Sequence, residues 1–408
     1  MKVGIYINTV LPEAGGGYTF ESQLLNAIIT HQKQNGSGHK FVLLVNSGMQ
    51  DIDVGNIKVV DLREKRRFCL ANKIRFYILF LCRKAASRKT LEKSRIENIL
   101  RTEGIEFLIY IKQRDLLTLD VPYMTIVWDL QHRLQPYFPE VSNHHIWKQR
   151  EERQKILLQR AAYILTGTNA GRKQIERFYQ VPTERIIVNP MPVPGLIKDF
   201  TDEEISQVLA KYRLGKNYLL YPAQFWPHKN HATLLKAVEL LKSRYNLLID
   251  VILTGADHGN KNHIQYIAQK LGITEQIRMP GFIDRKELSI LYKKAFALIY
   301  VTFFGPDNLP PLEAFAFGCP VIASNVDGAE EQLGNAALFV NPHQVDEITE
   351  SIYKLYQNPS LRNELIKKGC EQINSLSQCN YLQKIISALN EFEIIRNCWS
   401  SSEAYIVK

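Results

Sequence analysis

The chain has 408 residues, of which 45% are hydrophobic and 23% are charged, proportions that exclude an intrinsically disordered protein. The length exceeds the roughly 250 to 300 residues at which one hydrophobic core stops growing, so we expect two domains. The formal net charge is +10, yet no recognisable nucleic-acid-binding module accompanies it, so we expect no nucleic acid partner. The six cysteines include no C-x-x-C pair, which favours a reducing, cytoplasmic location over a disulfide framework or a zinc site.

The first half of the chain alternates short apolar runs with amphipathic stretches, a pattern typical of parallel strands covered by helices. The run at 2–7 is too short for a signal peptide or a membrane span and is interpreted as the first buried strand. Further strands are expected at 41–45, 107–110, 124–128 and 163–166, and a helix at 169–179. We assign residues 1–190 to an N-terminal domain.

Residues 63–95 carry twelve basic and two acidic side chains around the apolar stretch 74–82. A basic helix of this kind can lie on a membrane, with its apolar face among the acyl chains and its cations near lipid phosphates. A solvated basic helix on the protein surface has the same composition. Both interpretations stay open, and the first predicts peripheral contact with the anionic inner face of a membrane.

The segment 189–195 contains three prolines and can form neither a helix nor a central strand, so we interpret it as the linker between domains. After it the alternation resumes. Strands are expected at 218–222, 249–254, 276–279, 297–301, 320–323 and 337–340, with helices at 230–243, 260–271, 285–294 and 311–317, and further helices at 344–375 and 379–397. The expected fold class is therefore α/β, with two doubly wound, Rossmann-like domains.

Open parallel sheets bind ligands at the carboxyl ends of their strands, so the turns that follow strands are the candidate sites. After the first strand, Gly16 and Gly17 would let the backbone approach a phosphate at a helix N-terminus, although a plain flexible turn has the same composition. Lys229 lies between a buried strand and a helix. Its ammonium and the helix N-terminus would together hold a diphosphate, and an ordinary surface lysine is the alternative.

The segment 303–324 carries the most specific signal. Two prolines open a short helix, where their missing N–H groups are harmless, and Gly318 can close it in a left-handed conformation. We expect Glu313 in the first turn of that helix, where its carboxylate either accepts hydrogen bonds from vicinal hydroxyls such as those of a ribose or merely favours the helix dipole. The backbone N–H groups of Asn308 and Leu309 are expected to be free to face phosphate oxygens.

This segment resembles the nucleotide-sugar-binding signature of the retaining glycosyltransferases of family GT4, which have the GT-B fold of two Rossmann-like domains facing across a cleft. The resemblance covers nearly the whole chain and includes the glycine turn at 15–17, the segment 129–132, Lys229, the Gly281-Phe282 turn and the segment 325–331. It implies a soluble enzyme that moves a hexose or deoxyhexose from a nucleotide-diphosphate sugar to an acceptor hydroxyl without a metal or another cofactor. It also implies a second domain at 196–378, and a last segment, 379–408, that returns to the N-terminal domain.

The resemblance further implies that Glu313 holds the ribose, that Lys229 holds the diphosphate and that the backbone near Phe282 borders the base. Gly16 and Gly17 would close on the donor from the other domain. Lys229 and helix N-termini would then carry the negative charge of the leaving diphosphate, so that no metal is needed. The triplet 51–53 has the D-x-D pattern of metal sites in a different transferase fold, but we assign it to an exposed loop.

Two departures from the family pattern concern the donor. The first glutamate of the family's E-x7-E motif is replaced by Gly305, so Asp307 or Asn308 would contact the donor sugar from a displaced position, or the sugar would need fewer contacts. The arginine that usually accompanies the phosphate lysine is Gln224, which can donate a hydrogen bond but supplies no charge. Stabilisation of the leaving group would then depend on Lys229.

A third departure concerns the N-terminal domain. Trp128 stands where the family has a histidine, directly before Asp129. His132 either substitutes for that histidine or is an ordinary structural one, and we place His132 and Asp129 with Lys229 and Glu313 in the expected catalytic group.

By family analogy, the acceptor is a lipid-linked or phosphorylated glycan and the process is surface polysaccharide or glycoconjugate biosynthesis. Two other classes stay open. A GT-B chain without the first glutamate could be a non-catalytic scaffold or binding subunit, and a nucleotide-sugar epimerase could use the same architecture. A nicotinamide-dependent dehydrogenase is disfavoured, because its glycine fingerprint is absent.

Overall fold

The computed structural model describes residues 1–7, 16–35, 38–45, 54–62, 88–111, 119–193, 195 and 199–399. The triplet 51–53 and residues 63–87 of the basic segment lie outside these residues, and so do the predictions of an exposed loop and of membrane contact there. Residues 88–95 of the basic segment form the start of helix α3. Among the described helices, none combines the length and the apolar character needed to cross a membrane.

The first domain contains a seven-stranded sheet in which every strand is parallel to its neighbours, in the order β3-β2-β1-β4-β5-β6-β7. Its strands are β1 (Lys2–Ile7), β2 (Lys40–Val45), β3 (Lys58–Asp61), β4 (Phe107–Tyr110), β5 (Tyr123–Ile126), β6 (Tyr163–Thr166) and β7 (Ile186–Val188). Its helices are α1 (Gly16–Asn35), α3 (Arg88–Thr102), α4 (Gln131–Leu134), α5 (Pro139–Ser142), α6 (His144–Arg160) and α7 (Asn169–Tyr179), followed by the short 3-10 helix η2 (Thr183–Arg185).

The second domain repeats this winding with a six-stranded parallel sheet in the order β10-β9-β8-β11-β12-β13. Its strands are β8 (Tyr218–Pro222), β9 (Asp250–Thr254), β10 (Ile277–Gly281), β11 (Ala297–Tyr300), β12 (Val321–Ser324) and β13 (Ala337–Val340). Its helices are α8 (Asp202–Lys211), α9 (His231–Tyr245), α10 (Lys261–Lys270), α11 (Arg285–Lys294), α12 (Leu309–Ala316), α13 (Ala329–Leu333), α14 (Val345–Gln357) and α15 (Pro359–Gln372), with 3-10 helices η3 (Pro227–Lys229), η4 (Thr274–Gln276) and η5 (Ile373–Ser375).

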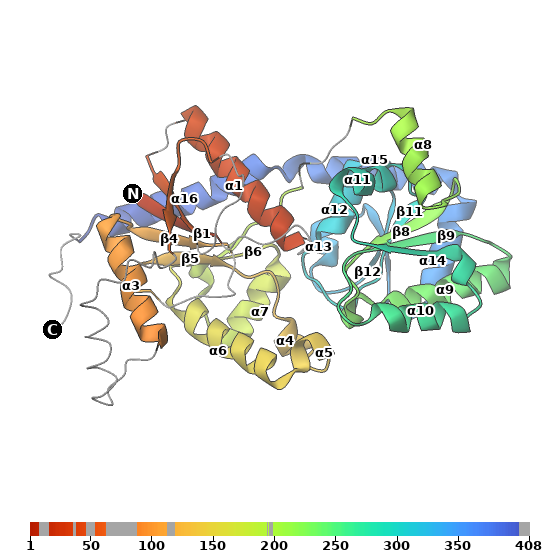
Figure 1. Ribbon diagram of the computed structural model, residues 1–408, viewed down its shortest axis with the longest axis horizontal. Coiled ribbons are helices and arrows are strands. Elements are labelled where there is room, and N and C mark those ends of the chain that lie inside the picture. The colour runs from red at the N-terminus through yellow and green to blue at the C-terminus, as the bar shows by residue number, and fades with distance from the viewer. Residues whose placement is uncertain are drawn as a thin grey trace, which may run out of the picture.

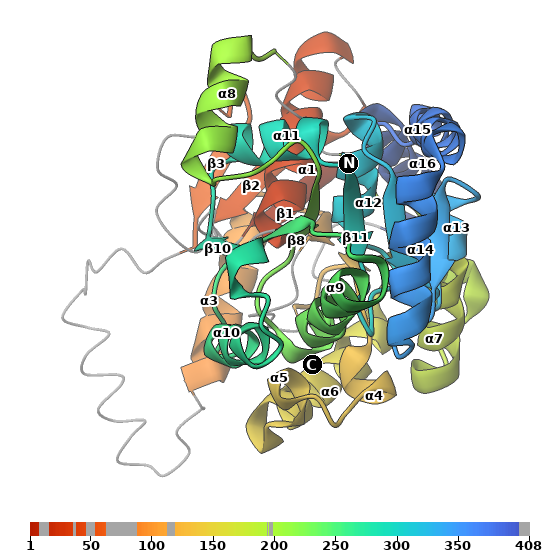
Figure 2. The same ribbon diagram turned by 90° about the vertical axis from the view of Figure 1, so that its right-hand side faces the viewer.

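Both sheets reverse their winding direction beside the first strand of the domain, between β1 and β4 and between β8 and β11. Helices therefore cover both faces of each sheet. In the second domain α9 and α10 lie on one side, and α11 and α12 lie on the other (Figures 1 and 2). The α/β prediction of two doubly wound domains is confirmed. Ligands bind beside such reversals, at the carboxyl ends of the strands. Each domain therefore has a candidate binding edge there.

Four local predictions need correction. The edge strands β3 and β7 were not expected, because each has only three or four residues and these are not a continuous buried run. Strand β5 ends at Ile126 instead of 128. Helix α12 begins at Leu309, two residues before the expected start, so Glu313 lies in its second turn.

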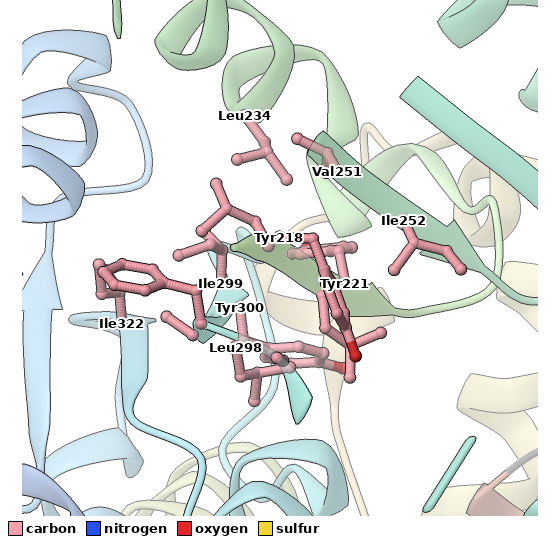
Figure 3. Packing of buried hydrophobic residues seen from close by; sticks show 14 of the residues in the cluster. Tyr218, Tyr221, Leu234, Val251, Ile252, Leu298, Ile299, Tyr300 and Ile322 are labelled. Atoms are coloured by element: carbon pink, nitrogen blue, oxygen red, sulfur yellow. The ribbon is translucent and has the colours of Figure 1, made fainter. Parts of the chain in front are cut away.

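The core of the second domain is built from strand residues that are fully buried, among them Tyr218, Tyr221 and Leu298. Figure 3 shows these buried side chains around the strands, with the rings of Tyr221 and Tyr300 close to each other. The two ring centroids are 5.5 Å apart and the ring planes differ by 22°. The hydroxyl ends of these two tyrosines reach the edge of the core, where the candidate site lies.

The last helix, α16 (Gln378–Arg396), leaves the second domain and packs on the first. Figure 1 shows it running alongside α1. Tyr381, Leu389 and Phe392 belong to the core around β1, and the Phe392 ring lies 4.7 Å from that of Phe107. The N-terminal ammonium also donates to Glu393 at 2.5 Å. The first domain is therefore completed by residues from the far end of the chain.

This arrangement predicts that the first domain loses stability when α16 loses a buried ring. Phe392→Ala should destabilise the chain by about 3 kcal/mol, because the substitution removes a large buried side chain and leaves a cavity. Ile394→Ala, on the same helix but 73% exposed, should change stability by less than about 0.5 kcal/mol. Urea unfolding followed by tryptophan fluorescence measures both, and equal midpoints for the two variants would contradict the packing of α16.

Candidate active site

A cleft of about 640 Å³ lies between the two domains. The second domain lines it with the carboxyl ends of β8, β9 and β11, at Pro222, Thr254 and Tyr300. The first domain contributes the start of α1, including Gly17, and the loop after β5, including Asp129. The cleft thus lies where the reversed winding of the sheets predicts a ligand.

Lys229 ends η3 and its ammonium points into the cleft beside the N-terminus of α9. Nζ donates to the Tyr300 hydroxyl at 3.0 Å and lies 5.2 Å from the centroid of the same ring. Its backbone carbonyl accepts a hydrogen bond from the Tyr221 hydroxyl. Lys229 forms no ion pair with a carboxylate of the described residues. Its charge is therefore available to an anion in the cleft.

Glu313 lies in α12, and a buried side chain fixes one of its carboxylate oxygens. Its Oε2 accepts a hydrogen bond from the Tyr292 hydroxyl at 2.7 Å. Burial raises the pKa of Glu313, and the Tyr292 hydroxyl and the charge of Arg285 act against that shift. The residue lines the cleft, so the carboxyl group is fixed at one oxygen and accessible to a ligand at the other.

The other predicted donor-binding residues of the second domain also line the cleft, namely Gln224, Phe282, Asp307, Asn308 and Leu309. The Phe282 ring is 49% exposed, which leaves a face for stacking. The Gln224 side chain accepts a hydrogen bond from Trp226 Nε1 at 2.9 Å. The prediction that the Asn308 N–H is free is wrong, because it donates to Gln332 Oε1 at 3.0 Å.

Gly305, which stands at the position of the family's first glutamate, adopts a backbone conformation that favours glycine. Its φ is +142°, a conformation that side chains rarely adopt, and a Cβ placed there would lie 2.5 Å from the Asn308 amide. Asn308 Nδ2 donates back to the Gly305 carbonyl at 2.7 Å. The loop before α12 is thus closed on itself, and no side chain fits at the usual position.

Asp307 lies at the contact between the domains. Oδ1 accepts from Gln332 Nε2 at 2.6 Å, whereas Oδ2 is buried and has no hydrogen-bond partner among the residues that the structure describes. A Cβ on Gly167 of the first domain would come within 1.6 Å of Oδ2, so a larger residue there would displace the carboxylate. Burial and the neighbouring charge of Glu331 raise the pKa of Asp307 to about 7.

On the first-domain side, Gly16 is the first residue of α1 and Gly17 lines the cleft. Asp129 also lines the cleft, and its Oδ1 accepts from Arg150 at 2.7 Å and from the Gln131 N–H at 2.9 Å. Burial acts to raise the pKa of Asp129, but Arg150 and the Gln131 N–H outweigh it and lower this pKa overall. Asp129 is therefore an anchored carboxylate.

The expectation that His132 substitutes for the family's histidine is wrong. Its side chain is fully buried and contributes nothing to the cleft lining. Nε2 lies 3.1 Å from the Tyr179 hydroxyl and 3.3 Å from Glu151, under helices α6 and α7. Burial lowers its pKa to about 4. Position 132 falls on the inward face of α4, so the side chain packs into the first domain and away from the ligand.

No sequence pattern indicates several residues that the structure brings to the cleft. The Tyr292 hydroxyl holds Glu313, and the Tyr300 hydroxyl holds Lys229. In the sequence, both tyrosines have the pattern of ordinary core residues. His228 lines the cleft next to Lys229, and its partner Glu140 comes from α5 of the other domain. Such pairs depend on how the domains meet. No group of three or more His, Cys, Asp or Glu side chains within the described ranges is arranged to hold a metal ion.

Two Rossmann-like domains that face each other across a cleft are also found in known proteins. Residues 202–372 match the family "Glycosyl transferases group 1". The resemblance drawn from the sequence is confirmed. The structure is similar to that of HepE from Anabaena, solved in complex with UDP and glucose, with 13% identity and a TM-score of 0.69 over 96% of this chain and 100% of that one. This likeness confirms the GT-B fold.

Among curated relatives, the O-antigen chain mannosyltransferase B of Escherichia coli is 31% identical over 57% of this chain and 61% of its own length. The O-antigen chain mannosyltransferase RfbU of Salmonella typhimurium strain LT2 is 28% identical over 50% of this chain and 54% of its own length. The chain thus spans less than two thirds of the length of these relatives. Both are mannosyltransferases by name.

The raised pKa of Asp307 predicts a pH-dependent stability. The folded protein holds the Asp307 proton up to about pH 7, whereas an aspartate in an unfolded chain loses it near pH 4. The stability conferred by that proton is therefore complete below about pH 4 and is lost as the pH rises through 7. Asp307→Asn should melt at a higher temperature than wild type at pH 8, and the gap should narrow toward pH 5.

Thermal unfolding at several pH values checks this prediction, with the exposed Asp327→Asn as the control. A melting difference for Asp307→Asn that is the same at pH 5 and pH 8 would show that the carboxylate is not forced into a buried, unpartnered position.

Proposed function

We propose that this chain transfers a hexose, with mannose as the first candidate, from a nucleoside diphosphate sugar to an acceptor hydroxyl with retention of anomeric configuration. The observation that carries the proposal is that one cleft holds both an ammonium, which pairs with no carboxylate in the described part of the chain, and a carboxylate with one open oxygen. A nucleoside diphosphate needs these two groups, a cation for its phosphates and an acceptor for its ribose diol. The match to the group 1 family and the names of the relatives support it.

In this proposal Lys229 binds the diphosphate together with the N-terminus of α9. Glu313 accepts hydrogen bonds from the ribose hydroxyls through the oxygen that Tyr292 leaves open. The exposed Phe282 ring borders the base, and the N-terminus of α1 at Gly16 and Gly17 closes over the phosphates from the first domain. Asp307 and Asn308, with Leu309, border the sugar in place of the missing glutamate.

The chemistry follows from where charge develops. As the bond from the anomeric carbon to the phosphate oxygen breaks, negative charge grows on the diphosphate, and Lys229 with the two helix N-termini lies ready to stabilise it. We propose that this arrangement makes a metal unnecessary. The closing of two domains around both substrates orients them and excludes water from the reacting centre.

We further propose that the acceptor is a lipid-linked or phosphorylated glycan and that the protein works in the cytoplasm, at the inner face of a membrane. The basic composition of residues 63–95 supports contact with anionic lipid. On the same domain, Tyr137, Ile146 and Ile156 are exposed apolar side chains.

The donor site predicts a selective effect of two substitutions on nucleotide binding. At a hundredfold excess over its dissociation constant, the correct nucleoside diphosphate should stabilise wild type by about 2.7 kcal/mol. Lys229→Ala and Glu313→Ala should each lose most of that stabilisation, whereas Lys270→Ala, exposed on α10, should keep it. A thermal-shift screen with UDP, GDP, dTDP, ADP and CDP and their sugar conjugates measures the effect. A chain stabilised by none of them would favour a non-catalytic scaffold.

Metal independence is tested by the transfer rate. Because Lys229 and helix dipoles carry the leaving-group charge in this account, the release of nucleoside diphosphate in the presence of acceptor should continue at an unchanged rate in excess EDTA. A loss of more than about tenfold that Mg²⁺ or Mn²⁺ restores would instead place a metal at the diphosphate.

A further inference from the structure

Glu140 and His228 meet across the contact between the two domains. Glu140 belongs to α5 of the first domain, and His228 precedes Lys229 in η3 of the second. Glu140 Oε1 lies 2.5 Å from His228 Nδ1 and 3.2 Å from the His228 backbone nitrogen. The side chains are only 6% and 12% exposed. Since the pair is shielded from water, this charge-assisted hydrogen bond is strong and holds the ring in one orientation.

Aromatic side chains fix the same contact from the side. Phe138 of the first domain stacks on Phe303 of the second at a centroid distance of 5.9 Å and meets the His228 ring edge-on at 6.2 Å. Gln135 Nε2 donates to the Phe303 carbonyl at 2.9 Å. The imidazole is therefore held between the domains by packing as well as by Glu140.

The charges around this ring favour a neutral imidazole beside an ionised carboxylate. Burial lowers the pKa of His228, helped by the charge of Lys229 and opposed by Glu140 and Asp129. For Glu140, burial acts to raise the pKa, but the bond to His228 outweighs it and the pKa is lowered overall. Nδ1 then carries the proton that Glu140 accepts, and Nε2 keeps a free lone pair.

His228 lies at the wall of the cleft, next to Lys229. Its Nε2 has no hydrogen-bond partner among the described residues. The next residue in the chain is Lys229, which holds the diphosphate in the proposed function. In a transfer with retention, the acceptor approaches on the face from which the diphosphate leaves. A base beside Lys229 is thus on the side of the incoming hydroxyl.

We propose that His228 is a further catalytic residue, the base that receives the proton of the acceptor hydroxyl, and that Glu140 of the opposite domain is its positioning residue. This inference rests on the proposed function. As the acceptor oxygen bonds to the anomeric carbon, its O–H bond breaks and the proton moves to Nε2. The bond from the anomeric carbon to the phosphate oxygen breaks in the same process, and its electron pair leaves with the diphosphate. Glu140 stabilises the imidazolium that forms.

One consequence concerns hydrolysis. Because Glu140 and His228 come from different domains, the base is oriented only while the cleft is closed. An open enzyme that has bound donor alone lacks the oriented base and so protects the donor from water. The family position for a cleft histidine is Trp128 here, so the second domain supplies the histidine that the first domain lacks.

The test compares transfer, binding and pH dependence in four variants of the full chain. His228→Ala removes the base, His228→Gln keeps a hydrogen bond to Glu140 without a base, and Glu140→Gln removes the positioning charge. His263→Ala, an exposed histidine on α10, is the matched control. GDP-mannose and UDP-glucose serve as donors and octyl mannoside as acceptor, and thermal shift with GDP and UDP reports on the binding site.

We expect kcat to fall by about 10²- to 10⁴-fold in both His228 variants, with nucleotide stabilisation and donor KM unchanged. Added imidazole should restore part of the rate of His228→Ala. Glu140→Gln should lower kcat by about tenfold and shift the acidic limb of its pH profile to lower pH, because the carboxylate no longer raises the pKa of the imidazole. The control should match wild type.

An unchanged kcat in His228→Gln would overturn the inference and leave the diphosphate itself as the proton acceptor. So would a loss that imidazole does not restore and that accompanies weaker nucleotide binding, since His228 would then only build the site. A wild-type chain that binds nucleotide but transfers nothing from either donor would overturn the proposed function, and this inference with it.

Discussion

The candidate site depends on an ammonium in the cleft that pairs with no carboxylate of the described residues. Lys229 Nζ is held by the Tyr300 hydroxyl and ring, and its backbone carbonyl by Tyr221. Both tyrosines are strand residues whose rings stack in the core of the second domain. A neutral hydroxyl orients the cation but cannot neutralise it, so the positive charge remains for a ligand. Packing of the core thereby sets the position of a charged group at its edge.

Several contacts between the domains are polar and lie around the cleft. Glu331 of the second domain accepts from the Asn169 backbone N–H at the N-terminus of α7, at 2.6 Å and 2.8 Å. Glu140 meets His228, and Asp307 faces Gly167. Polar contacts of this kind form and break with little change in buried apolar area, so they suit domains that must open to exchange substrates. Helix α16 and the linker join the domains permanently.

Most of the fold could be predicted from the sequence, because buried parallel strands are continuous apolar runs. Strand β4, in which all four residues are buried, is an example. The edge strands β3 and β7 lack that pattern and were missed. Lys229 and Glu313 could be selected because each follows a buried strand and belongs to a family motif. His132 could not be judged correctly, since sequence position does not give the direction of a side chain on a short helix.

The remaining parts of the site depend on tertiary structure. The conformation of Gly305, with its φ of +142°, follows from the bond that Asn308 makes to it, and no local pattern indicates that bond. The Glu140–His228 pair joins residues 88 positions apart on different domains. Only the docking of one domain on the other brings these two residues together. The part of the site that closes over the substrates therefore could not be predicted from the sequence.

The most direct test of the account is a crystal structure of the chain with the nucleoside diphosphate that stabilises it. The account predicts the diphosphate within hydrogen-bonding distance of Lys229 Nζ and the ribose hydroxyls on the Glu313 carboxylate, with the base beside Phe282. A nucleotide bound elsewhere, or bound in the cleft with its phosphates away from Lys229, would contradict it.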